Sequence, residues 1–167
     1  MTNYPQYPAG PPEPPPGPAP LGEPPRSIAM AIDLIWVGVG LTVLSTILSF
    51  VNLDDAVQTA VDGDNTGTLT ESSARTGIIA ASVFILIIGV GIYALLAIFL
   101  GKGKNWARIV YTVLGAIFGL LGVLGLGGDQ PALTMLLGVV QLALITATLF
   151  FLWKPESTAW LTGRPAR

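Results

Sequence analysis

The stretch that decides the fold is residues 78–100, IIAASVFILIIGVGIYALLAIFL, which contains no charged residue. A helix of roughly 20 residues crosses the hydrocarbon core of a bilayer, about 30 Å thick. Lipid offers no partner for backbone polar groups, so only helices and closed barrels can cross it. Because the stretch is continuously apolar rather than alternating, it predicts a transmembrane helix and not a barrel strand.

Working outward from this stretch, three more apolar segments of similar length occur, at residues 28–51, 106–126 and 132–153. The first is too long for the core of a secretory signal, and a proline-rich segment precedes it instead of a short basic start. We therefore expect it to be retained. The sequence predicts an all-α integral membrane protein, with four transmembrane helices in an antiparallel up-down bundle over residues 27–154.

Composition agrees with this prediction and excludes much chemistry. Of the 167 residues, 51% are hydrophobic and only 11% are charged, whereas a soluble domain carries about 25% charge. The chain has no cysteine and no histidine, which excludes disulfides, thiolate or imidazole metal sites and a Ser-His-Asp triad. With no phosphate-binding loop, paired catalytic carboxylates or basic aromatic groove, we expect no enzymatic activity, no cofactor and no nucleic-acid partner.

The N-terminal segment has a different composition from the rest of the chain. Eleven of the 14 prolines precede residue 26. Proline removes backbone donors and disfavours both helix and sheet, so residues 1–26 predict a disordered proline-rich cytoplasmic tail near polyproline II. Such a tail acts either as a ligand for an aromatic groove or as a spacer. Residues 155–167 are expected to form a second, short cytoplasmic tail.

Basic residues predict the orientation, because they are retained on the cytoplasmic side in short loops. Residues 53–77 hold five acids against Arg75 alone, and we expect them to form an acidic external loop. The prediction is a multi-pass plasma (inner) membrane protein with both termini cytoplasmic. The seven basic residues on that side are Arg26, Lys102, Lys104, Arg108, Lys154, Arg164 and Arg167.

Glycines in the third helix predict close helix packing. Gly115, Gly119 and Gly122 are spaced i, i+4 and i+7, so they line one face of the helix. Small residues let the backbones of membrane helices approach each other. Two interpretations stay open, a homodimer or partner interface and packing within the bundle. We favour the second, because this spacing is common in polytopic proteins.

Two polar residues interrupt the apolar segments, and an intramembrane acid is by default a proton or ion site. Asp33 would lie at the headgroup level if the hydrocarbon begins at residue 34, which still leaves roughly 20 residues for the span. Gln141 lies near the middle of the fourth helix, and we expect it to bond another helix rather than a substrate. The only indication of an interrupted helix, as in transporters, is Gly89-Val90-Gly91.

Residues 62–73, DGDNTGTLTESS, resemble a calcium loop of the EF-hand type. Asp62, Asp64 and Thr66 occupy the first three ligand positions, but the final bidentate position is a serine and Glu71 comes two places early. These four residues, Asp62, Asp64, Thr66 and Glu71, form a weak calcium-site candidate. The alternative is a solvated acidic loop built from turns.

The stretches 101–108, GKGKNWAR, and 153–160, WKPESTAW, carry a family resemblance. Together with the proline-rich start and the four helices, they resemble a largely uncharacterised group of small actinobacterial membrane proteins. The resemblance implies a bacterial plasma membrane and implies no activity.

Two functional hypotheses follow. The first is a non-enzymatic accessory or scaffold protein, packed into a larger membrane assembly, whose tail tethers or recruits a cytoplasmic partner. The second is a small oligomeric transporter or channel that uses Asp33, Gln141 and the glycine pair. The expected partners are the lipid bilayer and either another membrane protein or further copies of the chain.

Overall fold

The structure, a computed structural model, describes residues 22–125 and 131–163. Within these ranges the chain forms helices and turns and no strand. The elements are α1 (Arg26–Ser49), the 3-10 helix η1 (Phe50–Asn52), α2 (Leu53–Asp62), α3 (Glu71–Gly101), α4 (Asn105–Gly125), α5 (Ala132–Leu152) and α6 (Pro155–Thr162).

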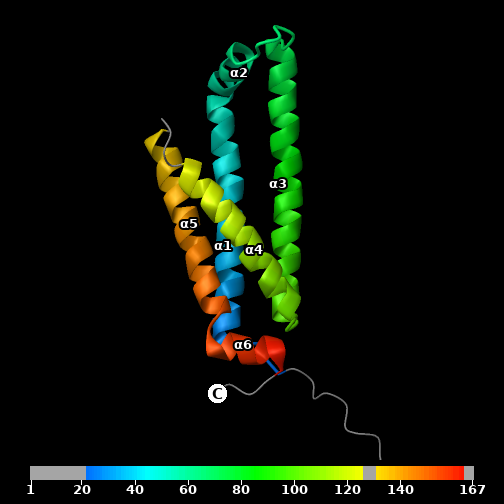
Figure 1. Ribbon diagram of the computed structural model, residues 1–167, viewed down its shortest axis with the longest axis vertical. Coiled ribbons are helices and arrows are strands. Elements are labelled where there is room, and N and C mark those ends of the chain that lie inside the picture. Colours follow the sequence, from blue (N-terminus) through cyan, green and yellow to red (C-terminus); the bar gives the residue numbers. More distant parts are fainter. Residues whose placement is uncertain (1–21, 126–130, 164–167) are drawn as a thin grey trace, which may run out of the picture.

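Helices α1, α3 and α5 run roughly along the long axis of the molecule, and α4 crosses it obliquely (Figure 1). We call one end the α2 end, where α2 joins α3. The other, the α6 end, holds α6, the start of α1 and the turn between α3 and α4. Helix α1 packs mainly on α5 and α3, while α4 starts beside α3 and crosses to α5. All four helices are long and apolar enough to cross a membrane, so the chain is a multi-pass membrane protein.

The buried core lies at the α6 end. It includes Ile28 of α1, Leu100 of α3, Tyr111 of α4, Leu152 of α5 and Leu161 of α6. The four long helices and α6 all contribute here because each of them begins or ends at this level. Apart from Val57 and Ala74, every buried apolar side chain of the described residues belongs to this core. Toward the α2 end the long helices therefore pack less closely.

Three of the four expected helices have boundaries that agree within two residues at the ends that the structure describes, but the segment 53–77 differs. We expected a loop, and instead η1 continues α1 into α2, and α3 begins at Glu71. Two effects favour helix there. Asp54 and Asp55 lie in the first turn of α2, where negative charge is favourable, and Val57 is buried on one side of it. The prediction of an acidic loop was wrong for most of this segment.

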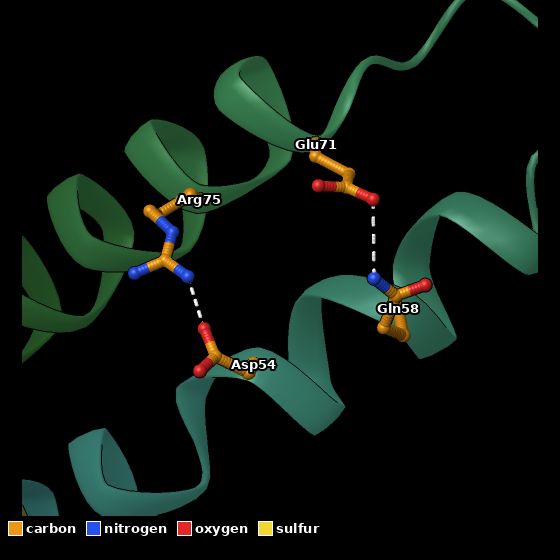
Figure 2. Close-up of polar contacts among 4 residues, drawn as sticks. All are labelled: Asp54, Gln58, Glu71 and Arg75. Carbon is orange, nitrogen blue, oxygen red and sulfur yellow. Dashed lines mark hydrogen bonds and ion pairs between the residues drawn. The ribbon is translucent and has the colours of Figure 1, made fainter.

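The start of α3 is stabilised by a capping box, in which Thr70 accepts from the Ser73 N–H and Ser73 bonds back to the Thr70 backbone. Polar contacts then join α3 to α2 (Figure 2). Arg75 forms an ion pair with Asp54, and the Gln58 Nε2 donates to the Glu71 Oε1 at 3.1 Å. These two helices form a small lobe at the α2 end.

Residues 155–162 also differ from expectation, because they form α6 instead of a tail. Pro155 is suited to the first turn of a helix, where its missing N–H is not needed. The Ser157 hydroxyl contacts the Ser27 hydroxyl at 2.8 Å and the Phe151 carbonyl at 2.7 Å. Helix α6 therefore docks on the bundle across the α6 end (Figure 1). The predicted N-terminal tail lies mostly outside the described residues, and its last residue, Arg26, begins α1.

Candidate functional site

A cavity of about 470 Å³ lies between α1, α3, α4 and α5. At its α6 side it meets Tyr93 and Tyr111, whose rings pack edge to face with centroids 5.8 Å apart. Most of the lining is aliphatic, and no charged side chain contributes to it. Its size falls in the range of ligand pockets, about 300–1,000 Å³. The cavity forms because the closely packed core is confined to the α6 end.

Small residues from all four long helices line this cavity: Gly38, Gly89, Gly122 and Gly138. A Cβ added at Gly89 would meet no heavy atom within 4 Å, so the space beside it is empty. Gly91 is equally unobstructed but does not line the cavity. The two glycines, which are two positions apart in the sequence, therefore have different surroundings.

Gln141 is the most polar group of the cavity lining. A Cβ added at Gly38 would lie 3.5 Å from the Gln141 Nε2, so the amide faces α1. Its Oε1 is buried and accepts no hydrogen bond from any described residue. The predicted hydrogen bond to another helix is thus not formed by this oxygen, which leaves an acceptor at the centre of the bundle.

Hydroxyl groups of α1 form a further part of the polar lining. The Thr42 hydroxyl donates to the Gly38 carbonyl at 2.9 Å, and Thr46 and Ser49 make corresponding bonds one turn further along. Each hydroxyl hydrogen is therefore used within α1, while the oxygens keep lone pairs free to accept. Ser82 adds a hydroxyl from α3.

The glycines of α4 face α5. A Cβ added at Gly115 would lie 3.2 Å from the Ile145 Cγ2, and one at Gly122 would lie 3.2 Å from the Leu142 Cδ2. At Gly119 the nearest atom is 4.0 Å away. These contacts favour packing within the bundle, the interpretation preferred from sequence.

Asp33 is exposed and does not line the cavity. Buried residues of α1 include Ala31 and Ile35, and two positions along a helix correspond to about 200°, so Asp33 points away from the core. The structure places it two turns inside the start of α1 and on the outer surface of the bundle.

Helix α3 runs without interruption through Gly89 and Gly91. The indication of a broken helix was therefore wrong. Glycine is tolerated within membrane helices, and the backbone bonds of α3 continue on both sides of the pair.

The calcium-loop candidates are not gathered around one point. Both carboxylate oxygens of Asp64 accept hydrogen bonds from its own loop, from Thr66 N–H (3.0 Å) and hydroxyl (2.6 Å) and from the N–H groups of Thr68 (2.8 Å) and Leu69 (2.7 Å). The Thr66 hydroxyl and these N–H groups lower the pKa of Asp64 to about 2. Glu71 instead bonds Gln58, and the described residues contain no group of three acidic side chains placed to hold a metal. The geometry fits the alternative, a loop of turns anchored by Asp64.

A second polar cluster, at the α6 end, was missed from sequence. Arg108 is only 6% exposed. Its Nη1 donates to the Thr158 Oγ1 at 2.9 Å, and its Cζ lies 4.4 Å from the centroid of the Trp153 ring. The sequence placed Arg108 in the first turn of the third helix, as one of the cytoplasmic-side cations, and the Lys-Pro-Glu-Ser-Thr sequence at the start of α6 was the available signal of the helix that buries it.

No protein-family model, curated protein or solved structure matches this chain. Function is therefore inferred from the cavity, the α6-end cluster and the distribution of charge.

Proposed function

We propose that the chain is a non-enzymatic accessory or scaffold component of a larger membrane assembly, and that the cavity receives side chains of a partner transmembrane helix. The observation that carries this proposal is the composition of the cavity lining: glycines, hydroxyls and one amide among aliphatic side chains, with no charge. Helix interfaces in membranes are enriched in small residues and in uncharged hydrogen-bonding groups.

The empty space beside Gly89 and the unpaired Gln141 Oε1 support a protein partner. A partner helix would fill the space beside Gly89 with an apolar side chain and would donate a hydrogen bond to the Gln141 Oε1. Leaving a buried acceptor without a donor costs about 1–3 kcal/mol. Docking of a partner would recover this free energy.

The membrane topology is part of the proposal. Lys102, Lys104 and Lys154 lie at the α6 end, whereas the acids of α2 and its loop lie at the α2 end. Positive residues are retained inside, so the α6 end is proposed to face the cytoplasm of a bacterial cell, with an antiparallel bundle between. The proline-rich N-terminal tail would then be available to a cytoplasmic partner.

Single cysteines test this topology, because the natural chain has none. Lys104→Cys and Asn65→Cys lie in exposed turns at opposite ends. In intact cells an impermeant thiol reagent is expected to label only Asn65→Cys. After permeabilisation the reagent should label both variants. Labelling of Lys104→Cys in intact cells would reverse the proposed orientation.

The scaffold proposal is tested by filling the cavity. Gly89→Leu places a side chain in the cavity and Gly91→Leu, the matched control, places the same side chain outside it. A photo-crosslinking residue at Ser82, which lines the cavity, is expected to crosslink to one partner protein of defined mass. That crosslink should disappear with Gly89→Leu and persist with Gly91→Leu. Persistence in both would contradict the proposal.

The second candidate is a small oligomeric transporter, and the buried Gln141 acceptor within a ligand-sized cavity is the observation that favours it. It predicts purification as a homo-oligomer whose thermal stability rises with a neutral solute. It also predicts loss of that rise in Gln141→Leu. Continuity of α3 and the exterior position of Asp33 weigh against it.

A further inference from the structure

We propose that the α6-end cluster binds the phosphate of an anionic membrane lipid, with Arg108 as the residue that meets it. The proposal concerns a site separate from the cavity and does not depend on what the cavity receives.

Arg108 carries a buried charge without a counter-charge. No described carboxylate lies within 4.0 Å of it, since the one ion pair within residues 22–125 and 131–163 is Arg75 with Asp54 at the opposite end. Thr158 and the Trp153 ring hold the guanidinium in place, but neither neutralises it. A buried charge needs a partner of opposite charge.

The unpaired atoms of Arg108 form one edge of the guanidinium. Nε is buried and has no hydrogen-bond partner, and the one hydrogen bond from the guanidinium to a described residue is that of Nη1 to Thr158. The Nε and Nη2 groups together form the fork that binds phosphate in a bidentate manner. Because Nε is enclosed, the phosphate would bind Nη2 first, and a small rotation of the guanidinium would bring Nε into the contact.

The surroundings of Arg108 are electropositive. Helix α4 begins three residues earlier, has no acid in its first turn, and meets the first turn of α6 at Thr158. The N-terminus of each helix, which is the positive end of its dipole, therefore lies at this end. Glu156 is exposed and lies two positions before Thr158, about 200° around the helix and thus on its opposite side.

The depth of the site matches lipid phosphate. Arg108 lies about one helical turn inside the start of a membrane-spanning helix. Exposed Trp106 and Trp153 lie at the same end, and tryptophan is favoured at the headgroup level. Basic pockets between transmembrane helices at this level bind lipid headgroups. The phosphate of a lipid is therefore the anion that reaches Arg108.

The test compares lipid retention by the full chain, by native mass spectrometry, after reconstitution with equal phosphatidylcholine and phosphatidylglycerol. The wild type is expected to retain phosphatidylglycerol preferentially. Arg108→Gln should lower this preference about tenfold, since a hydrogen bond to a charged group contributes that much. Arg75→Gln, the matched control at the α2 end, should leave it unchanged. Equal preference in Arg108→Gln and wild type would overturn the proposal.

Two further arms keep the outcome decisive. If Arg108→Gln does not fold, Arg108→Lys retains the charge and loses the fork; an unchanged preference in it would overturn the proposal, and a partial loss would support it. Inorganic phosphate, added to the protein in phosphatidylcholine alone, distinguishes the source. Thermal stabilisation by millimolar phosphate equal to that by phosphatidylglycerol would overturn the assignment to lipid.

Discussion

Gly115 and Gly91 are both glycines within membrane-spanning helices, but they have opposite surroundings. An added Cβ would contact Ile145 tightly at Gly115 and nothing at Gly91. Spacing in the sequence indicates which glycines share a face, whereas the partner of that face depends on how α4 crosses α5. The same holds for Arg108, whose charge is evident in the sequence but whose burial depends on α6.

Gly115→Leu is expected to lower the free energy of unfolding by roughly 1–3 kcal/mol, because the added side chain overpacks the contact with Ile145. Gly91→Leu carries the same change in helix propensity and should not show this loss. Reversible unfolding in mixed micelles measures both. Equal stability of the two variants would mean that α4 and α5 are not in close contact.

Asp64 provides a prediction about pH. Its pKa falls from 3.8 to about 2 in the folded loop, so its hydrogen bonds add stability that is complete above pH 3.8 and is lost as the pH falls toward 2. The carboxyl carbon resonance of Asp64 should titrate with a midpoint near 2 in the folded chain. A midpoint at the ordinary value would contradict the hydrogen-bonded loop.

At the scale of elements, α2 and α6 are the helices that the sequence did not predict. Both are short and lack a continuous apolar segment, which was the signal used for the four spans. Their helical structure depends on docking, through Val57 in α2 and through Ser157 and Leu161 in α6. An isolated helix of this length is marginal in water, so tertiary contacts decide whether it forms.

Val57→Ser tests the docking of α2, since Val57 is 3% exposed and its neighbour Ala56 is exposed. The loss of buried apolar surface should increase amide hydrogen exchange in α2 about tenfold, a change of ~1.4 kcal/mol. Exchange in the middle of α3 should be unaffected. Ala56→Ser is the matched control, and an equal effect from it would show that burial of Val57 does not hold α2.

At the scale of the whole molecule, the four long helices could be predicted because each carries its own signal, independent of the others. The location of the core and the cavity could not. Lipid-facing and buried side chains are equally apolar in a membrane protein, so hydropathy does not distinguish the packed α6 end from the looser α2 end. The two ends differ in packing only because of the way in which the helices cross.

Truncation tests how much of the N-terminal segment the bundle needs. Deletion of residues 2–21 is expected to leave membrane insertion and the free energy of unfolding unchanged, because a proline-rich segment contributes little core. Deletion of residues 2–28 should cost about 1.5–3 kcal/mol, since it removes the fully buried Ile28. Thermal unfolding of both forms measures the difference, and equal stability would exclude a structural role for the start of α1.

The sequence by itself determined the membrane class, the four spans and the separation of basic from acidic segments, because the cost of placing polar groups in lipid acts on each segment locally. Tertiary structure decided which glycine meets a neighbour, that Asp33 points outward, that Gln141 Oε1 is unpaired and that Arg108 is buried. These properties belong to pairs of helices. They depend on crossing angles and on α6, which no single segment encodes.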